Sequence, residues 1–191
     1  MNPHHTQPIS NDWGPLSQLP GNPLMWVLIL SELLVFSAFF VLYAWMRSSD
    51  PALYNLAQQQ LNPLLGGINT LILLTSGLFA ALAGIAIARG NPQLSRRWLL
   101  WAMVGGALFC VVKLVEYSIK FRAGIGLEEH SFFTFYYLLT GFHFAHVLFG
   151  LGLLGVAYLW CTRENVATTT AFWHMVDLIW VILYPLFYLM R

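Results

Sequence analysis

The sequence predicts an all-α, polytopic membrane protein built as a bundle of five transmembrane helices. Of its 191 residues, 58% are hydrophobic and only 9% are charged, whereas soluble domains carry about a quarter charged residues. The mean hydropathy is +0.65, and five apolar segments are each long enough to cross a membrane. Nine Lys and Arg and eight Asp and Glu are too few to cover a water-facing surface. These numbers exclude a soluble enzyme, a disordered chain and a nucleic-acid-binding protein.

The chain divides into a tail and one transmembrane domain. Residues 1–22 are polar and lack Lys and Arg, so they do not resemble the basic start of a signal peptide. The domain, residues 23–191, contains predicted helices at about 23–46, 66–88, 98–121, 131–158 and 171–190. Each reaches the roughly 20 residues that cross the hydrocarbon core at about 1.5 Å per residue.

Turn-forming residues separate these helices in order. Pro23 suits the first turn of the first helix. Residues 48–51 end that helix, and 51–61 is a candidate interfacial helix. Residues 90–92 (Gly-Asn-Pro) end the second helix, and two glycines within 124–126 separate the third from the fourth. Aromatic residues near helix ends are typical of an interfacial belt: Trp26, Tyr43, Trp45, Trp98, Trp101, Trp160, Tyr184 and Tyr188.

An odd number of spans places the two termini on opposite sides of the membrane. Positive charges are balanced, with four on each side, so the positive-inside rule does not by itself set the orientation. The N-terminal side has Arg89, Arg96, Arg97 and Arg163, and the other side has Arg47, Lys120, Arg122 and Arg191. The three arginines of the tight 89–97 loop favour an N-terminus inside.

Charged side chains within apolar segments are costly and need a partner or a function. Glu32 lies close to mid-membrane, where a carboxyl is expected to be protonated or hydrogen bonded to a neighbouring helix. It is either a neutral acid that joins two helices or a proton-linked or gating carboxyl. Lys113 and Glu116 are spaced i, i+3 and share a helix face, which predicts an internal ion pair. Tyr117 is a candidate for a further hydrogen bond to it.

Histidines at the same spacing occur in the last two helices. His143 and His146 lie in the fourth, and His174 and Asp177 lie in the fifth. Facing helices of this kind can build a metal site or supply axial haem ligands, but no ExxH or HExxH motif occurs. The pattern favours an interhelical hydrogen-bond network in which Asp177 orients His174 or a histidine of the fourth helix. We therefore expect no metal and no catalytic residue.

Small residues are spaced for close helix packing. Gly77 pairs with Ala81, and Ala80 pairs with Gly84, on the second helix, while Gly150 lies on the fourth. Packing within the chain is favoured over a subunit interface.

Five motifs in one order resemble subunit III of the haem-copper oxidases, from about Trp26 to the C-terminus. They are WVLILSELLVFSAFFVLYAWMRSS, INTLILLTSG, KLVEY, TGFHFAHVLFG and FWHMVDLIWVILY. By this resemblance Glu32 matches the family's buried, carbodiimide-reactive glutamate, and Lys113 stands where oxidases usually have Gln. The family often has seven helices. The first two have no counterpart here, so the family's lipid-holding cleft cannot form within this chain.

The resemblance implies an accessory subunit without a cofactor of its own, which binds phospholipid and assembles with a haem-bearing, metal-containing catalytic subunit. The KLVEY form and the short loops are most similar to the NorE-type branch associated with nitric oxide reductases, which is the first expectation. Subunit III of an aerobic terminal oxidase using cytochrome c or quinol is the alternative.

Other classes are a small proton or solute transporter and an intramembrane metalloenzyme. The inverted repeats and broken helices typical of transporters are not found in the sequence. The implied location is the bacterial inner (cytoplasmic) membrane, with the N-terminus cytoplasmic and the C-terminus periplasmic.

Overall fold

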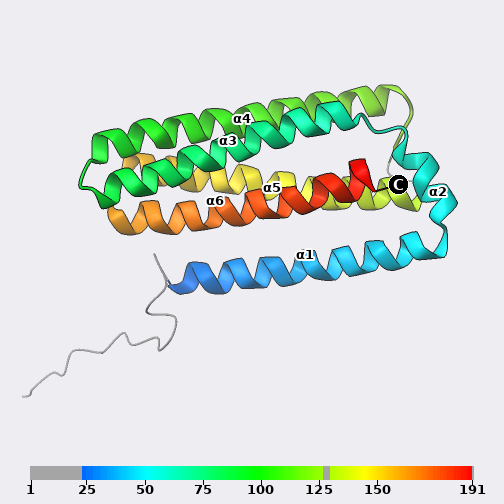
Figure 1. Ribbon diagram of the computed structural model, residues 1–191, viewed down its shortest axis with the longest axis horizontal. Helices are drawn as coiled ribbons and strands as arrows, with labels where there is room; N and C mark the ends of the chain where they lie inside the picture. Colours follow the sequence, from blue (N-terminus) through cyan, green and yellow to red (C-terminus); the bar gives the residue numbers. More distant parts are fainter. Residues whose placement is uncertain (1–22, 127–129, 191) are drawn as a thin grey trace, which may run out of the picture.

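The computed structural model describes residues 23–126 and 130–190, and the predicted tail 1–22 lies outside them. The described residues form helices and no β-strand (Figure 1). The helices are α1 Pro23–Ser49, α2 Pro51–Gln58, α3 Pro63–Ala88, α4 Pro92–Arg122, α5 Ser131–Leu159 and α6 Arg163–Tyr184, and a π-helical turn, Pro185–Leu189, follows α6. All but the short α2 are long and apolar enough to cross a membrane. The predicted five-span, all-α fold is therefore confirmed.

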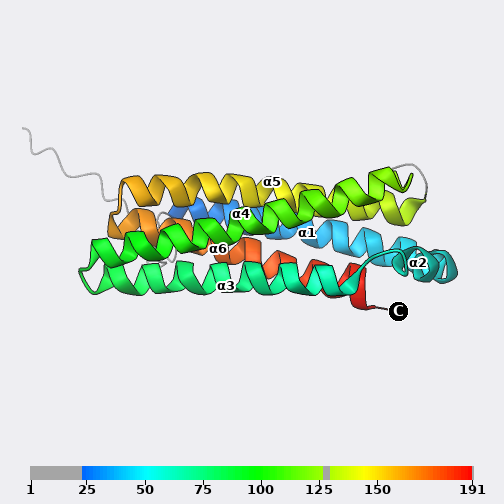
Figure 2. The same cartoon turned by 90° about the horizontal axis from the view of Figure 1, so that it is seen from above.

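The long helices run side by side along one axis and alternate in direction (Figures 1 and 2). Helices α3, α4, α5 and α6 form a closed ring in which each contacts two neighbours. Helix α1 lies outside this ring and packs against α5 and α6. Helix α2 crosses the axis at the end where α1 stops and α3 begins (Figure 2). The first described residue and the C-terminal turn thus lie at opposite ends of the bundle.

Three helices begin with the same local device, an Asp or Asn followed by Pro. The side-chain oxygens of Asp50, Asn62 and Asn91 accept hydrogen bonds from backbone N–H groups of the first turn. The proline that follows fits there because its missing N–H would have no helical partner. Residues 90–92 therefore do more than end α3. They start α4 at Pro92, whereas the apolar segment predicts a start near residue 98.

Helix α6 also begins earlier than hydropathy predicts, at Arg163 rather than near residue 171. Thr162 caps it by accepting a hydrogen bond from the Asn165 N–H at 3.1 Å. The polar first turns are compatible with a helix because their hydroxyl groups bond to the helix itself. Thr170 Oγ1, for example, donates to the Val166 carbonyl at 2.8 Å.

A buried tryptophan of α6 fills the ring at one level. A Cβ atom at Gly106 or Gly150 would lie 2.6 or 2.8 Å from the Trp173 ring, so both positions need glycine. Trp173 Nε1 donates to Ser76 Oγ at 3.2 Å, and Ser76 donates to the Ala102 carbonyl at 2.7 Å. Gly150 therefore makes room for a tryptophan side chain rather than for the backbone of a neighbouring helix.

The small residues of α3 have three different surroundings. At Gly77 the Asp177 carboxylate fills the space that a Cβ atom would occupy, and Ala80 is fully buried. Gly84 has no atom within 4 Å of a Cβ position. Packing within the chain thus accounts for Gly77 and Ala80 but not for Gly84.

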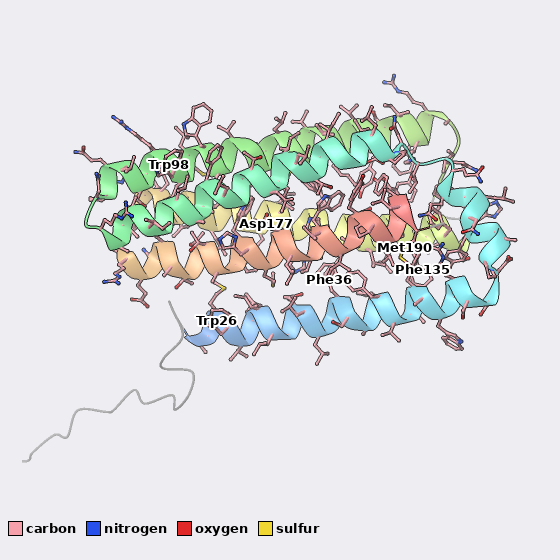
Figure 3. All side chains as sticks on the ribbon, in the orientation of Figure 1. Trp26, Phe36, Trp98, Phe135, Asp177 and Met190 are labelled. Atoms are coloured by element: carbon pink, nitrogen blue, oxygen red, sulfur yellow. The ribbon has the colours of Figure 1, made fainter. Side chains whose placement is uncertain are left out.

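Helix α1 contacts the ring through aromatic side chains. Phe36 lies between α1 and α6 (Figure 3), and its ring centroid is 5.2 Å from that of Phe142 on α5. Tyr43 is fully buried and donates to the Leu186 carbonyl at 3.4 Å. Tyr43 is therefore not the interfacial-belt residue that its position in the sequence predicts. The opposite face of α1 is exposed, with Val41 71% accessible.

Candidate functional site

A lysine and a glutamate of α4 form the centre of a buried polar cluster. Lys113 is fully buried, and its Nζ donates to Glu116 Oε2 at 3.0 Å. The same Nζ donates to the hydroxyl oxygens of Tyr136 and Tyr188, each at 3.0 Å. Those two hydroxyls in turn donate to Glu116 Oε1 at 2.9 and 2.7 Å. The ion pair that the spacing predicts thus forms, with two tyrosines completing it.

This cluster is closed. The three N–H donors of the ammonium are all used, and each tyrosine both accepts from the lysine and donates to the glutamate. Opposite charges in a dry site stabilise each other only when the remaining donors and acceptors are paired in this way. The cluster ties α4 to α5 through Tyr136 and to the π-helical turn through Tyr188.

Two sequence-based expectations about tyrosines are wrong here. Tyr117 makes no hydrogen bond to Glu116, and its hydroxyl pairs instead with Thr140 Oγ1 at 2.7 Å. Adjacent residues of a helix point in directions about 100° apart, so Tyr117 faces away from its neighbour's carboxylate. Tyr188, expected in the interfacial belt, is buried in the cluster. No sequence motif links Tyr136 or Tyr188 to α4.

A carboxyl and an imidazole join α1 to α5. Glu32 Oε2 lies 3.0 Å from His146 Nε2. His146 Nδ1 lies 2.8 Å from the Phe142 carbonyl oxygen, which can only accept, so Nδ1 carries a proton. One further proton then lies between Nε2 and Oε2, on the acid or on the imidazolium. Either form of the pair is neutral overall, as hydrocarbon depth requires.

The pair is partly accessible from outside the ring. The side chains of Glu32 and His146 are 21% and 11% exposed. They line a pocket of about 250 Å³ between α1, α5 and α6, together with Leu28, Ala145, Phe149 and Phe172.

His143 lies one turn before His146 but faces the interior of the ring. It is fully buried and stacks on Trp180 with ring centroids 5.2 Å apart. Neither of its ring nitrogens has a hydrogen-bond partner within the described part of the chain. The interhelical hydrogen bond expected for His143 is therefore not formed there. Asn69, which belongs to the INTLILLTSG motif but is not a predicted site residue, is a buried amide of α3 that is unpaired in the same sense.

The second histidine–carboxylate pair lies between α3 and α6. His174 Nδ1 is 3.5 Å from Asp177 Oδ2, so Asp177 faces His174, which is the first of its two expected partners. The His174 side chain is 47% exposed and that of Asp177 only 9%. Figure 3 shows Asp177 where α6 approaches α3. Both residues line a groove of about 440 Å³, together with Leu74, Gly77, Leu78, Ala81, Leu178 and Val181.

The three membrane histidines diverge. His143 faces the ring interior, His146 faces α1 and His174 faces the α3–α6 groove. Over residues 23–126 and 130–190, no three His, Cys, Asp or Glu side chains are grouped as metal ligands. The i, i+3 spacings therefore do not bring the three histidines together at one place.

Five apolar spans joined by buried polar contacts define a polytopic membrane protein. The family model described as cytochrome c oxidase subunit III matches residues 21–191. The chain belongs to the cytochrome c oxidase subunit III family, as its five motifs indicate.

Relatives with different names match nearly the whole chain. Cytochrome c oxidase subunit 3 of Synechocystis sp. is 32% identical over 173 residues, which cover 85% of this chain and 72% of that protein. Cytochrome bo(3) ubiquinol oxidase subunit 3 of Buchnera aphidicola subsp. Schizaphis graminum is 27% identical over 174 residues, covering 86% and 91%. Heme-copper oxidase subunit I+III of Aeropyrum pernix is 29% identical over 181 residues, covering 86% and 22%.

We predict that Lys113→Met destabilises the protein severely, because it leaves the Glu116 carboxylate buried without a cation. Breaking a buried ion pair from one side costs about 3–5 kcal/mol. The double variant Lys113→Met/Glu116→Gln removes both charges and should recover most of this loss. Thermal unfolding of the detergent-solubilised protein measures both. A single variant as stable as the wild type, or a double variant no better than the single, contradicts the prediction.

We predict that Glu32→Gln preserves the α1–α5 contact, since the amide N–H donates to His146 Nε2. Glu32→Ala leaves that nitrogen unpaired and should cost about 1–3 kcal/mol. Glu164→Gln, at an exposed glutamate, is the matched control. Thermal unfolding compares the stability of the three variants. Equal stability of the Gln and Ala variants would contradict the prediction, because it would show that the Glu32–His146 hydrogen bond does not stabilise the protein.

Infrared spectroscopy distinguishes the two protonation forms of this pair. A carboxylic C=O band that disappears in Glu32→Gln places the proton on Glu32, and its absence from the wild type places it on His146.

Proposed function

We propose that the chain is subunit III of an aerobic terminal oxidase that oxidises cytochrome c or quinol. The observation that carries this proposal is the match of almost the whole chain to subunits named for cytochrome c oxidase and for cytochrome bo(3) ubiquinol oxidase. The relatives named above favour this function over the NorE-type association that the KLVEY run first suggested.

The structure offers a local explanation for the lysine of KLVEY. Lys113 completes a cluster with Glu116, Tyr136 and Tyr188, so its presence follows from packing within this chain. Association with a nitric oxide reductase is the second candidate, and it rests on KLVEY and the short loops alone.

The proposed role is accessory. The haem and metal that carry out the chemistry belong to the partner, subunit I, and this chain stabilises that subunit from the side. The relative from Aeropyrum pernix supports this arrangement, because its name assigns subunits I and III to one protein. The Lys113 cluster and the Glu32–His146 pair are satisfied by contacts between this chain's own helices, which suits a stabilising role. We propose that Glu32 chiefly joins α1 to α5.

Apolar hollows on the membrane-facing surface support phospholipid binding. One lies between α3 and α4 and measures about 320 Å³, with Phe79 and Trp101 among its residues. Another lies along the outer face of α1, between Leu34 and Trp45. Their linings suit acyl chains rather than polar ligands.

We propose that the chain lies in the bacterial cytoplasmic membrane with its N-terminus inside. Arg89, Arg96 and Arg97 are exposed at the N-terminal end of the bundle. This cluster of three in one tight loop supports the proposed orientation by the positive-inside rule. Alkaline phosphatase fused after Arg191 should be active, since it folds only in the periplasm. Activity instead from a fusion in the 89–97 loop would reverse the orientation.

Affinity purification in mild detergent tests the proposed function. The tagged chain should carry a haem-bearing subunit, seen in the visible spectrum and identified by mass spectrometry, and the complex should consume oxygen. Deleting the chain should leave turnover present but slower or less durable. Co-purification with a nitric oxide reductase supports the second candidate. Complete loss of turnover with an intact, assembled catalytic subunit contradicts an accessory role.

A further inference from the structure

We propose that the α3–α6 groove is the docking site for a transmembrane helix of the haem-bearing subunit, and that this helix presents a hydrogen-bond acceptor to His174 Nε2. The inference rests on the proposed function, because it identifies the surface through which that partnership forms.

The depth of His174 makes its exposure costly. The last span runs from Arg163 to Leu189, roughly 40 Å at about 1.5 Å per residue, so its ends extend beyond a hydrocarbon core of about 30 Å. With the core centred on this span, His174 lies roughly 11 Å inside the hydrocarbon. The imidazole is nevertheless 47% exposed. Lipid tails neither donate nor accept hydrogen bonds, so a polar group at this depth needs a protein partner.

The protonation of the pair fixes what that partner must offer. Asp177 Oδ1 has no hydrogen-bond partner within the described residues, so a proton there would be unpaired in a dry site. The contact available for a shared proton is therefore that between Asp177 Oδ2 and His174 Nδ1, which lie 3.5 Å apart.

Two neutral forms of the pair satisfy this condition. In one, an imidazolium donates to a carboxylate. In the other, a carboxylic acid donates to a neutral imidazole. Nε2 carries a proton in both forms. The groove thus presents an N–H donor, and the complementary group on the partner is an acceptor, such as a hydroxyl or a backbone or amide carbonyl.

The Glu32–His146 pair, on the other side of α6, shows how a histidine in this bundle can have both ring nitrogens paired. His146 uses one ring nitrogen for Glu32 and the other for the Phe142 carbonyl of its own helix. His174 Nδ1 lies 3.5 Å from Asp177 Oδ2, and the imidazole side chain that carries Nε2 is 47% exposed. Both ring nitrogens of His146 thus have partners within the chain, whereas Asp177 Oδ1 has none among the described residues.

The shape of the groove suits a helix. Gly77 and Ala81 are small, which allows a helix backbone to approach closely, and Leu78 and Leu178 form exposed apolar walls. Acyl chains fit such walls but leave the N–H unpaired. A second copy of the chain docked through the same groove would bring two N–H donors together. A helix of the catalytic subunit that carries an acceptor satisfies both the shape and the hydrogen bond.

Photo-cross-linking in the intact membrane tests the position of the partner. Benzoylphenylalanine is placed at Leu78 in the groove, or at Val41 on the outer face of α1, in the tagged full-length chain. These residues are 57% and 71% exposed. Ultraviolet light should join the chain to the haem-bearing subunit from position 78 and not from position 41.

Matched variants test the contact itself. Ala81→Leu fills the groove and should reduce the haem recovered per tagged chain by about tenfold or more. Ala44→Leu makes the same change at an exposed position of α1 outside the Leu34–Trp45 hollow and should have no effect. His174→Gln keeps an N–H donor and should retain most of the partner, whereas His174→Phe keeps a ring without the donor and should lose it.

The outcomes separate this inference from the proposed function. If the wild type carries the haem-bearing subunit but position 78 cross-links to a second copy, to lipid or to nothing, the docking site is wrong. Equal recovery with His174→Gln and His174→Phe overturns the hydrogen bond. A wild type that purifies without any haem-bearing chain overturns the proposed function and the docking with it.

Discussion

The ammonium group of Lys113 lies inside a membrane-spanning bundle where it has no contact with water, and much of the surrounding structure follows from pairing it. Glu116 supplies the opposite charge, and Tyr136 and Tyr188 complete the hydrogen bonds. Tyr188 lies in the π-helical turn that begins at Pro185, where the proline cannot donate a helical hydrogen bond. A Cβ atom at Gly66 would lie 2.9 Å from the Tyr188 ring, so α3 also makes room for this tyrosine.

The two histidine–carboxylate pairs have the same chemistry but different surroundings. Both lie within spans long enough to cross a membrane, and each brings an imidazole against a carboxyl group. The Glu32–His146 pair closes on itself through a backbone carbonyl and so fixes α1 against α5. The His174–Asp177 pair leaves a donor at an open groove. In lipid, where apolar surfaces have little preference among partners, one directional hydrogen bond at a small-residue groove provides specificity.

The sequence predicted the number and length of the spans because the thickness of hydrocarbon sets both. It misplaced the starts of α4 and α6, since hydropathy does not register polar first turns that are capped and hydrogen bonded within the helix. The i, i+3 spacing predicted the Lys113–Glu116 pair, which is local. The pairing of Glu32 with His146 joins residues 114 apart, and no local pattern encodes it. Tyr188 was predicted to be a belt residue because it lies near a helix end. Whether a residue there is buried depends on how the neighbouring helices pack, which local sequence does not show.

Lys113 of the KLVEY run stands where oxidases usually have Gln. Such a difference within a motif is weak evidence about which catalytic subunit the chain binds. Lys113 is 0% exposed, and its donors are all used inside the chain, so no other subunit can contact its charge. A side chain in that position alters packing among α4, α5 and the C-terminal turn, and it can vary with those neighbours while the partner stays the same. Selection between partners has to act through groups that a partner can touch. Within the described spans, His174 is the half-exposed member of a polar pair at hydrocarbon depth, so the residues that it meets carry more information about the complex than the lysine does.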